Sequence, residues 1–354
     1  MTIHLVYVKG NRISAPSAIT NELVARLADK YSVKVYDWHE KITIQPSSGD
    51  ILIGHPHPLP NTIYQNSFWQ QGWKKRILMS PFSHAMPECV AFFDNLVVES
   101  DAYLAITGKY WIDTLEKSIV SHWQPWIKQL NLAVNTKNYP FIKNKFNPIG
   151  QRRFLYIGNT NPPKGCDYLS LIADFNPHIK IGWIGSGQMS SNKIKAHGQR
   201  NFSRNSSLKL VSNYDFILQC GRSDANPTTI LEAAAWGLIP VCTPQSGYYN
   251  EDWVINIPLD DIESASNILK SLNNLGEDDL REYQRKARVA LEKYYHWDRF
   301  AKDVMECIES PKITQIIIPN LSHLRTTNEN RHQLKIIATD TMAKIESEKT
   351  IIFY

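Results

Sequence analysis

The stretch YDFILQCGRSDANPTTILEAAAWGLIPVCTPQSGY, residues 214–248, decides the fold class because it joins a strand, a helix and a second strand. Residues 216–218 form a short apolar run, which is typical of a buried parallel strand. Asn226 and Pro227 predict a helix start, with Asn226 as the N-cap and Pro227 at the first helical position, where no N–H is required. A glycine ends the helix, and residues 238–241 form the next strand. The stretch therefore predicts an α/β domain with a parallel sheet.

The start of this helix is a candidate anion site. The N–H groups of Thr228, Thr229 and Ile230 have no intrahelical partners and lie at the positive end of the helix dipole, where a diphosphate is a natural ligand. Glu232 lies on the face of the two threonines, one turn further along the helix. Asp224 precedes the helix in the loop. Two carboxylates thus flank a helix start that is suited to phosphate.

The order of these residues resembles the nucleotide-sugar signature of the retaining glycosyltransferases of family 4, which have the GT-B fold. In that family an acidic residue, seven intervening residues and a glutamate lead into the pattern Glu-Ala-x-Ala-x-Gly-x-Pro-Val. Asp224 and residues 232–241 match this pattern, with Asp224 where glutamate is usual. The resemblance implies two Rossmann-like domains whose parallel sheets face a central cleft, and a C-terminal helix that crosses back to the N-terminal domain. An ordinary capped helix in another kind of α/β protein is the alternative interpretation.

The composition is that of a soluble globular protein. The 354 residues are enough for two domains, and 43% are hydrophobic and 21% charged. No apolar run approaches the ~20 residues of a membrane span, and the N-terminus does not have the pattern of a signal peptide. Five scattered cysteines without a C-x-x-C pair favour reduced thiols over a disulfide framework or a zinc site. We therefore expect a cytoplasmic protein.

The net charge of +5 is mild. A modest basic face suits an anionic membrane surface, so peripheral contact with the inner face of the membrane stays open, although a solvated face is the simpler interpretation. Nucleic acid is disfavoured as a partner because the chain has no block of Lys and Arg and no basic-aromatic motif. The sequence does not indicate an oligomeric state.

In the first half of the chain, apolar segments at 2–9, 33–36, 51–54 and 76–79 predict strands of a parallel sheet. Together with the resemblance, this alternation predicts an acceptor-side domain over 1–148. His84 follows the last of these strands, where relatives in the resembled family place a histidine near the transferring sugar, so the resemblance makes it a catalytic candidate.

Two further histidines, His55 and His57, follow the strand at 51–54. We interpret them as part of a polar turn that follows this strand, and not as joint metal ligands.

The second half of the chain predicts a nucleotide-sugar-binding domain over 149–309. Its first strand ends at Gly158, a residue type that lets the backbone approach a ligand, and Lys164 can reach the same pyrophosphate. This loop resembles the family's Gly-Arg…Lys-Gly motif, with Asn159 where arginine is usual. Since one phosphate-binding cation is missing, we hypothesise that Arg153 or Arg222 replaces it. Residues 310–354 form an extension with a strand-like run at 316–318 and a predicted helix at 328–347.

The resemblance implies a glycosyltransferase that uses a nucleotide diphosphate donor, such as a UDP- or GDP-sugar, retains anomeric configuration and transfers to a glycan, lipid or small molecule. Lys164 and the helix N–H groups would stabilise the leaving diphosphate, Glu232 would accept from ribose hydroxyls and Asp224 from sugar hydroxyls. The sequence has no Asp-x-Asp pair, so we expect no metal and no other cofactor. The predicted site residues are, as catalytic groups, Lys164, Asp224, Glu232 and His84, and, as nucleotide-binding groups, Gly158, Asn159, Lys164, Gly185, Gly187, Thr228, Thr229, Ile230 and Glu232.

Two other functions fit the same pattern. A non-catalytic nucleotide-sugar-binding subunit is consistent with the departures at Asn159 and Asp224. A GT-B nucleotide-sugar epimerase would bind the same donor and turn it over without an acceptor.

Overall fold

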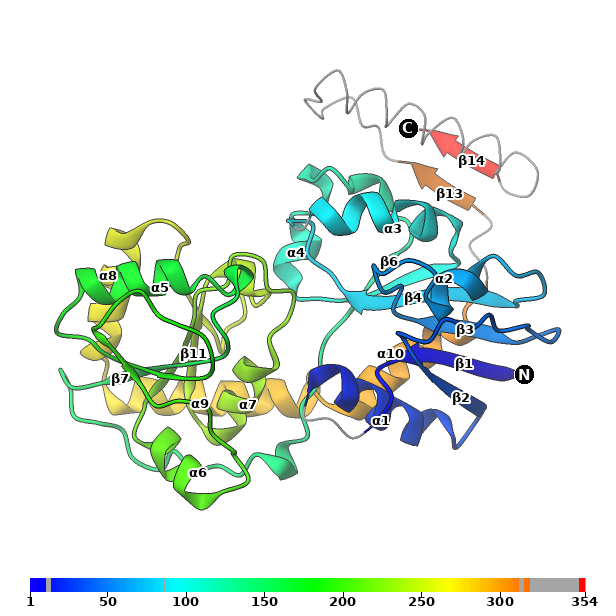
Figure 1. Ribbon diagram of the computed structural model, residues 1–354. Coiled ribbons are helices and arrows are strands. Elements are labelled where there is room, and N and C mark those ends of the chain that lie inside the picture. The colour runs from blue at the N-terminus through cyan, green and yellow to red at the C-terminus, as the bar shows by residue number, and fades with distance from the viewer. Residues whose placement is uncertain (11–13, 86, 312–314, 319–349, 354) are drawn as a thin grey trace. The chain divides into compact units, whose positions relative to one another are not determined.

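The computed structural model describes residues 1–10, 14–85, 87–311, 315–318 and 350–353. The chain divides into two α/β units, each with its own sheet (Figure 1). The first unit contains Met1–Ile106, Ile112–Leu130 and the described residues from Ala301 on, and the second contains Thr107–Trp111 and Asn131–Phe300. These bounds differ from the 1–148 and 149–309 expected from the sequence, because residues 131–148 pack on the second unit and the end of the last helix on the first.

The first unit has a six-stranded sheet in which all neighbouring strands are parallel, in the order β2-β1-β3-β4-β5-β6. Its strands are β1 (Thr2–Tyr7), β2 (Ser32–Asp37), β3 (Ile51–Gly54), β4 (Lys75–Pro81), β5 (Ala102–Ile106) and β6 (Ile127–Leu130). The chain leaves β1 for β2 on one side and returns to β3 on the other. The carboxyl ends of β1 and β3 therefore form the topological switch point, where open α/β sheets bind ligands.

The second unit repeats this design, with the order β12-β11-β10-β7-β8-β9 and parallel pairing throughout. Its strands are β7 (Arg153–Ile157), β8 (Lys180–Ile184), β9 (Ile194–Ala196), β10 (Phe216–Gln219), β11 (Ile239–Cys242) and β12 (Ile255–Asn256). The central strands β10 and β11 are buried along their whole length, as expected of a parallel strand covered on both faces. Here the switch point lies between the carboxyl ends of β7 and β10. The predicted α/β class, with two parallel sheets, is confirmed.

Helices connect the strands and cover the sheets (Figure 1). They are α1 (Ala15–Leu27), α2 (Ile63–Phe68), α3 (Pro87–Glu99), α4 (Lys109–Asp113), α5 (Cys166–Phe175), α6 (Asn205–Ser212), α7 (Thr228–Trp236), α8 (Ile262–Asn273), α9 (Glu277–Lys293) and α10 (Trp297–Glu309). Strands β13 (Gln315–Ile318) and β14 (Thr350–Phe353) pair in parallel apart from the two large sheets. The strand predicted at 316–318 is confirmed, whereas the helix predicted at 328–347 lies outside the described residues.

The end of α10 is fixed to the first unit by the buried Lys75. The ammonium group of Lys75 donates to the carbonyl of Cys307 at 2.7 Å and also to the carbonyl of Ser310. These carbonyls belong to the last turn of α10 and the residue after it, where a cation is favoured by the helix dipole. Glu309 adds contacts to Lys30 and to the hydroxyl of Tyr31. These bonds explain why the residues from Ala301 on belong to the first unit, as expected for a helix that crosses back.

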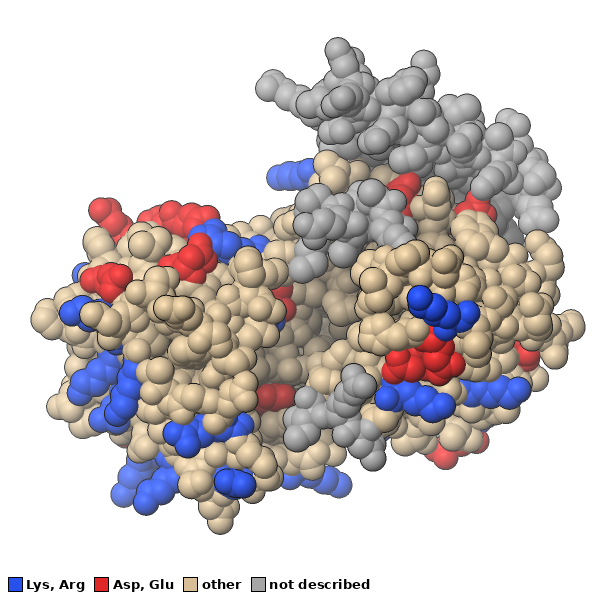
Figure 2. All heavy atoms as spheres, viewed as in Figure 1, with Lys and Arg blue, Asp and Glu red and all other residues tan. Residues whose placement is uncertain are grey.

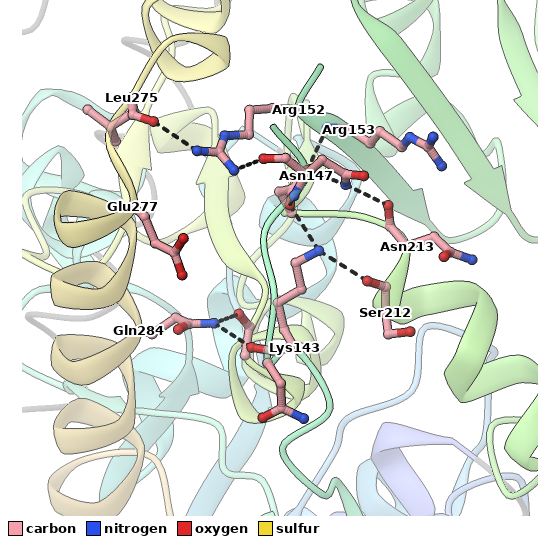
Figure 3. Close-up of polar contacts among 12 residues, drawn as sticks. Lys143, Asn147, Arg152, Arg153, Ser212, Asn213, Leu275, Glu277 and Gln284 are labelled. Carbon is pink, nitrogen blue, oxygen red and sulfur yellow. Dashed lines mark hydrogen bonds and ion pairs between the residues drawn. The ribbon is translucent and has the colours of Figure 1, made fainter. Parts of the chain in front are cut away.

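The segment that leads into the second sheet is anchored by a buried ion pair (Figure 3). Lys143 Nζ lies 2.9 Å from Asp215 Oδ1, and the two side chains are only 2% and 0% exposed. Lys143 also donates to the carbonyl of Ser212 at 3.1 Å. The Asp215 carboxylate accepts three more hydrogen bonds, from the backbone and side-chain amides of Asn147 and from the backbone N–H of Arg153. Residues 143–147 are thereby tied to the starts of β7 and β10.

Charged side chains of both signs are scattered over the face drawn in Figure 2, most of which is formed by other residues. In the second unit, acidic side chains gather over α5 and α8, whereas basic side chains are more frequent towards α6. The mild positive charge is thus dispersed on this face and not collected in one stripe. Within the described part of the chain, no helix has the length and apolar character needed to cross a membrane.

Candidate functional site

Two loops meet at the switch point of the second sheet. The loop after β7 carries Lys164 and Gly165, and the loop after β10 carries Cys220 and Arg222. Gly165 has φ +65°, and a Cβ atom there would lie 1.8 Å from the carbonyl oxygen of Cys220, so this contact requires glycine. The backbone N–H of Arg222 donates to the carbonyl of Pro163 at 2.9 Å. The loops that carry Lys164 and Asp224 are therefore held together by their backbones.

Lys164 and Asp224 form an ion pair in this loop contact. Lys164 Nζ lies 2.5 Å from Asp224 Oδ2, with the two side chains 29% and 15% exposed. The backbone of Asp224 is fixed on both sides, because its N–H donates to the carbonyl of Gln245 at 3.0 Å and its carbonyl accepts from Trp111 Nε1 at 3.2 Å. The structure thus brings together the two charged residues predicted for the diphosphate and the sugar, and pairs them with each other.

Helix α7 begins one residue later than the sequence predicts. Pro227 occupies the N-cap position, and no side chain caps the helix. Asn226 is not the N-cap, because its Oδ1 accepts a hydrogen bond from the buried Tyr248 hydroxyl at 2.8 Å. The N–H of Ile230 donates to the carbonyl of Pro227 at 3.3 Å, so the open amides of the first turn are those of Thr228 and Thr229.

Glu232 lies one turn into α7, and its carboxylate is engaged by a tyrosine from outside the predicted site. Its Oε1 accepts a hydrogen bond of 3.0 Å from the hydroxyl of Tyr139. Burial raises the pKa of Glu232, whereas hydrogen bonds from the side chains of Tyr139 and Thr228 act in the opposite direction. The two residues are 93 positions apart, and no local pattern in the sequence predicts this contact.

Gly185 and Gly187, predicted as nucleotide-binding residues, fit closely against the loop after β7. A Cβ atom on Gly185 would lie 1.8 Å from the carbonyl oxygen of Gly158, and one on Gly187 would lie 1.9 Å from Thr160 Oγ1. Asn159 shapes the same loop, because its Oδ1 accepts from the N–H of Asn161 at 3.1 Å. The two glycine turns therefore pack against the loop that follows β7, and their role in binding a nucleotide stays a prediction.

Neither arginine proposed as a second phosphate cation is suited to that role. Arg222 lies 2.8 Å from a carboxylate oxygen of Asp167 and 2.8 Å from one of Asp260, so two acidic groups already neutralise it. Arg153 opens β7, whereas Gly158 follows its end, and five residues of strand separate them by roughly 16 Å. Neither arginine is therefore placed to bind a phosphate together with Lys164.

His84 lies in the first unit. Its Nε2 is 2.7 Å from Thr114 Oγ1, and burial lowers the pKa of the imidazole, which favours the neutral form at neutral pH. Its proposed role beside a transferring sugar stays a prediction.

The switch point of the first sheet carries a cluster of rings that the sequence analysis did not predict. The rings of His55 and His57 lie 5.9 Å from each other, and both contact Trp38, at 4.7 and 5.4 Å. His39 lies 4.6 Å from His57. The chain turns at Pro56, as the sequence predicts, because the N–H of His57 donates to the carbonyl of His55 at 3.0 Å.

Burial, with smaller contributions from the neighbouring imidazoles, lowers the pKa of His55 to about 3, so this ring is neutral at neutral pH. Among the residues whose placement is described, no three His, Cys, Asp or Glu side chains are arranged to hold a metal ion.

The architecture matches solved glycosyltransferases of the GT-B fold. A glycosyltransferase from Rickettsia africae ESF-5 superposes with a TM-score of 0.62 at 13% identity over 87% of this chain and 97% of that one. Anabaena HepE, in complex with UDP and glucose, gives 0.58 at 12% identity over 88% of this chain and all of its own. Sucrose-phosphate synthase from Thermosynechococcus elongatus gives 0.61 at 12% identity over 86% and 97%. At these identities the comparison establishes the fold.

No protein-family model matches the sequence, and no curated protein sequence does either.

Proposed function

We propose that the protein is a glycosyltransferase that moves a sugar from a nucleotide diphosphate donor to an acceptor, with retention of anomeric configuration. The observation that carries the proposal is the position of Lys164 at the switch point of the second sheet, in one packed loop contact with the residues that lead into the uncapped start of α7. A cation and open backbone amides are the groups that bind a diphosphate. The fold shared with solved glycosyltransferases supports the same function.

The chemistry follows from where charge develops. Transfer breaks the bond between the anomeric carbon and the diphosphate oxygen, which leaves the diphosphate with more negative charge than it had in the donor. Lys164 and the amides of Thr228 and Thr229 are fixed donors that would interact more strongly with this charge in the transition state than in the donor. They would therefore accelerate the departure of the diphosphate, and no metal ion is required for this step.

UDP is the first donor nucleotide to test, because the solved HepE complex contains UDP and glucose; GDP is the second. For the acceptor we propose a molecule that presents a sugar, as a glycan, a glycolipid or a small glycoside. The exposed and half-buried rings of His39, His57 and Trp38 lie at the switch point of the first sheet, and aromatic faces with imidazole groups suit the C–H faces and hydroxyls of a sugar. Trp38→Ala should raise the KM for the acceptor without changing nucleotide affinity.

A non-catalytic nucleotide-sugar-binding subunit is the second candidate. It is favoured by the ion pair between Asp224 and Lys164 and by the neutralised Arg222, which leave this loop contact without a second cation. Such a subunit would bind the donor and transfer nothing to any acceptor. An epimerase would convert the donor in the absence of an acceptor.

The decisive experiment has two arms. Melting temperature is measured with UDP, GDP and ADP and their sugars, where a ligand at ~100 times its dissociation constant adds about 2.7 kcal/mol of stability. Sugar transfer to glycan, lipid and glycoside acceptors is then assayed with the donor that binds. Lys164→Ala should weaken the free diphosphate and the donor about tenfold to a hundredfold, which is the range for a charge-assisted contact of ~1.5–3 kcal/mol.

Asp224→Asn tests the pairing seen in the structure. Removal of the carboxylate charge frees Lys164 for phosphate, so the bare nucleoside diphosphate should bind more tightly while sugar transfer slows. Absence of binding by every nucleotide in the panel would refute both the transferase and the binding subunit.

A further inference from the structure

Tyr139 is the side chain from outside the predicted site that contacts its central carboxylate. It lies in the segment that joins the last strand of the first sheet to β7. Its hydroxyl donates to Glu232 Oε1 at 3.0 Å, and its ring packs on Trp236 of the same helix at 5.5 Å. The tyrosine thus holds α7 at two points, one polar and one aromatic.

The backbone around Tyr139 is fixed to the second unit on both sides. Before it, the N–H of Val134 donates to the carbonyl of Tyr295 at 2.9 Å. After it, the N–H groups of Ile142 and Lys143 both donate to the carbonyl of Trp236 at 3.0 Å, which satisfies the C-terminal end of α7. With its backbone fixed on both sides, the phenol hydroxyl has a defined direction towards Glu232.

The carboxylate of Glu232 needs such a partner. A carboxylate in a largely buried position tends towards its neutral form, and a neutral carboxylic acid cannot accept two hydroxyl hydrogen bonds in the way the anion does. A phenol that donates to one oxygen favours the anion and fixes the plane of the carboxylate. A side-chain hydrogen bond from Thr228 also reaches this carboxylate, and its remaining lone pairs can accept from donors of a ligand.

We propose that Tyr139 is a positioning residue for Glu232, and that it holds the carboxylate ionised and oriented to accept the 2′ and 3′ hydroxyl groups of the nucleotide ribose. The inference rests on the proposed function, because it needs a nucleotide at this helix. It assigns a role in donor recognition to a residue of the joining segment, outside the signature of α7.

Isothermal titration calorimetry of the full chain tests this role with two probes. The first is the nucleoside diphosphate that the wild type binds best among UDP, GDP and ADP, and the second is its 2′,3′-dideoxy form. Tyr139→Phe should weaken the ribonucleotide about tenfold, as expected for a hydrogen bond to a charged group, and should leave the dideoxy form unchanged. In a Glu232→Gln background, Tyr139→Phe should have no further effect.

The matched control is Tyr295→Phe, which removes a hydroxyl that donates to Glu251 Oε1 at 3.1 Å in the same unit. This variant should bind both probes as the wild type does. Binding is also measured between pH 5 and 8: loss of the phenol should move the fall in ribonucleotide affinity at acid pH to higher pH, which a purely packing role would not do.

Equal weakening of both probes, or an unchanged affinity and pH profile in Tyr139→Phe, would overturn the inference while leaving the proposed function intact. If the wild type binds none of the three nucleotides, the proposed function fails and this inference fails with it.

Discussion

Replacement of Lys143 by methionine is expected to destabilise the second unit more than any surface substitution. The variant keeps an apolar stem of similar length but removes the charge that lies 2.9 Å from Asp215 in an almost fully buried position. With an effective dielectric constant of 20, two charges at this distance attract each other by about 6 kcal/mol. Most of this attraction is offset by the desolvation of both ions, so the pair itself contributes little net stability.

The cost of the single substitution is nevertheless large, because it leaves Asp215 buried as an uncompensated charge. Three donors to its carboxylate remain, two from Asn147 and one from the backbone of Arg153. Removal of one partner from a buried pair typically costs about 3–5 kcal/mol. We expect a loss in this range in the free energy of unfolding of the second unit.

The assay is urea denaturation followed by fluorescence, with hydrogen-exchange mass spectrometry to assign the transition to peptides of the second unit. Lys137→Met is the matched control, since Lys137 is exposed in the same joining segment and its loss should change stability by no more than about 0.5 kcal/mol. If the cost comes from the unpaired charge, Asp215→Asn in the Lys143→Met background should recover part of the lost stability. A cost below 1 kcal/mol, or no recovery in the double variant, would refute this reasoning.

Three further outcomes are expected. Gly165→Ala should lose both stability and nucleotide affinity, because the new Cβ would lie 1.8 Å from the Cys220 carbonyl oxygen. The control Gly198→Ala has a similar φ of +68° but open space around it, so it should lose only the stability that the strained backbone costs. Equal melting temperatures and nucleotide affinities in the two variants would contradict this. The free energy of unfolding of the first unit should fall by up to about 1.4 kcal/mol per pH unit below pH 6.5. The pKa of His55 is about 3 in the native state and 6.5 in the unfolded state, so only the unfolded state takes up the proton. In His55→Phe, urea titrations at several pH values should show a smaller fall in this free energy per pH unit. Transfer activity should persist in excess EDTA, and loss of activity that one divalent ion restores would show that the leaving diphosphate needs a metal.

Much of the fold could be predicted because short stretches of sequence identify its central strands and helices. Strands β1, β3, β4, β7 and β10 are apolar runs next to glycine, proline or polar turns, and the structure confirms each of them. Strands β9 and β12 were not predicted because they are only three and two residues long, and β6 was not predicted because Lys128 and Gln129 interrupt its apolar run. The start of α7 was misplaced by one residue because Asn226, a good N-cap by type, instead accepts from the hydroxyl of Tyr248.

The candidate site could be predicted only as far as local patterns extend. Lys164, Asp224 and the first turn of α7 are recognisable from the spacing of residue types along the chain. The contacts between them are not, because Lys164 and Asp224 are 60 residues apart and Tyr139 and Glu232 are 93 apart. The ring cluster around Trp38 was missed for the same reason, since its residues follow β2 and β3, which end at one edge of the sheet.

The aspartate at position 224 shows how one departure from the expected pattern changes the electrostatics of the site. A glutamate would extend its carboxylate by about one bond length of ~1.5 Å, away from a backbone that is fixed by the Gln245 carbonyl and the Trp111 indole. The shorter aspartate ends on Lys164. Arg222 is neutralised in the same way by Asp167 and Asp260, so the positive potential that remains for a diphosphate comes mainly from the uncapped amides of α7. On the proposed function, a bound diphosphate would displace Asp224 from Lys164, and the displaced carboxylate would become free to accept a hydroxyl from the donor sugar. Phosphate binding and sugar recognition would then be coupled, so a nucleotide sugar should bind more tightly than the separate affinities for its diphosphate and its sugar predict.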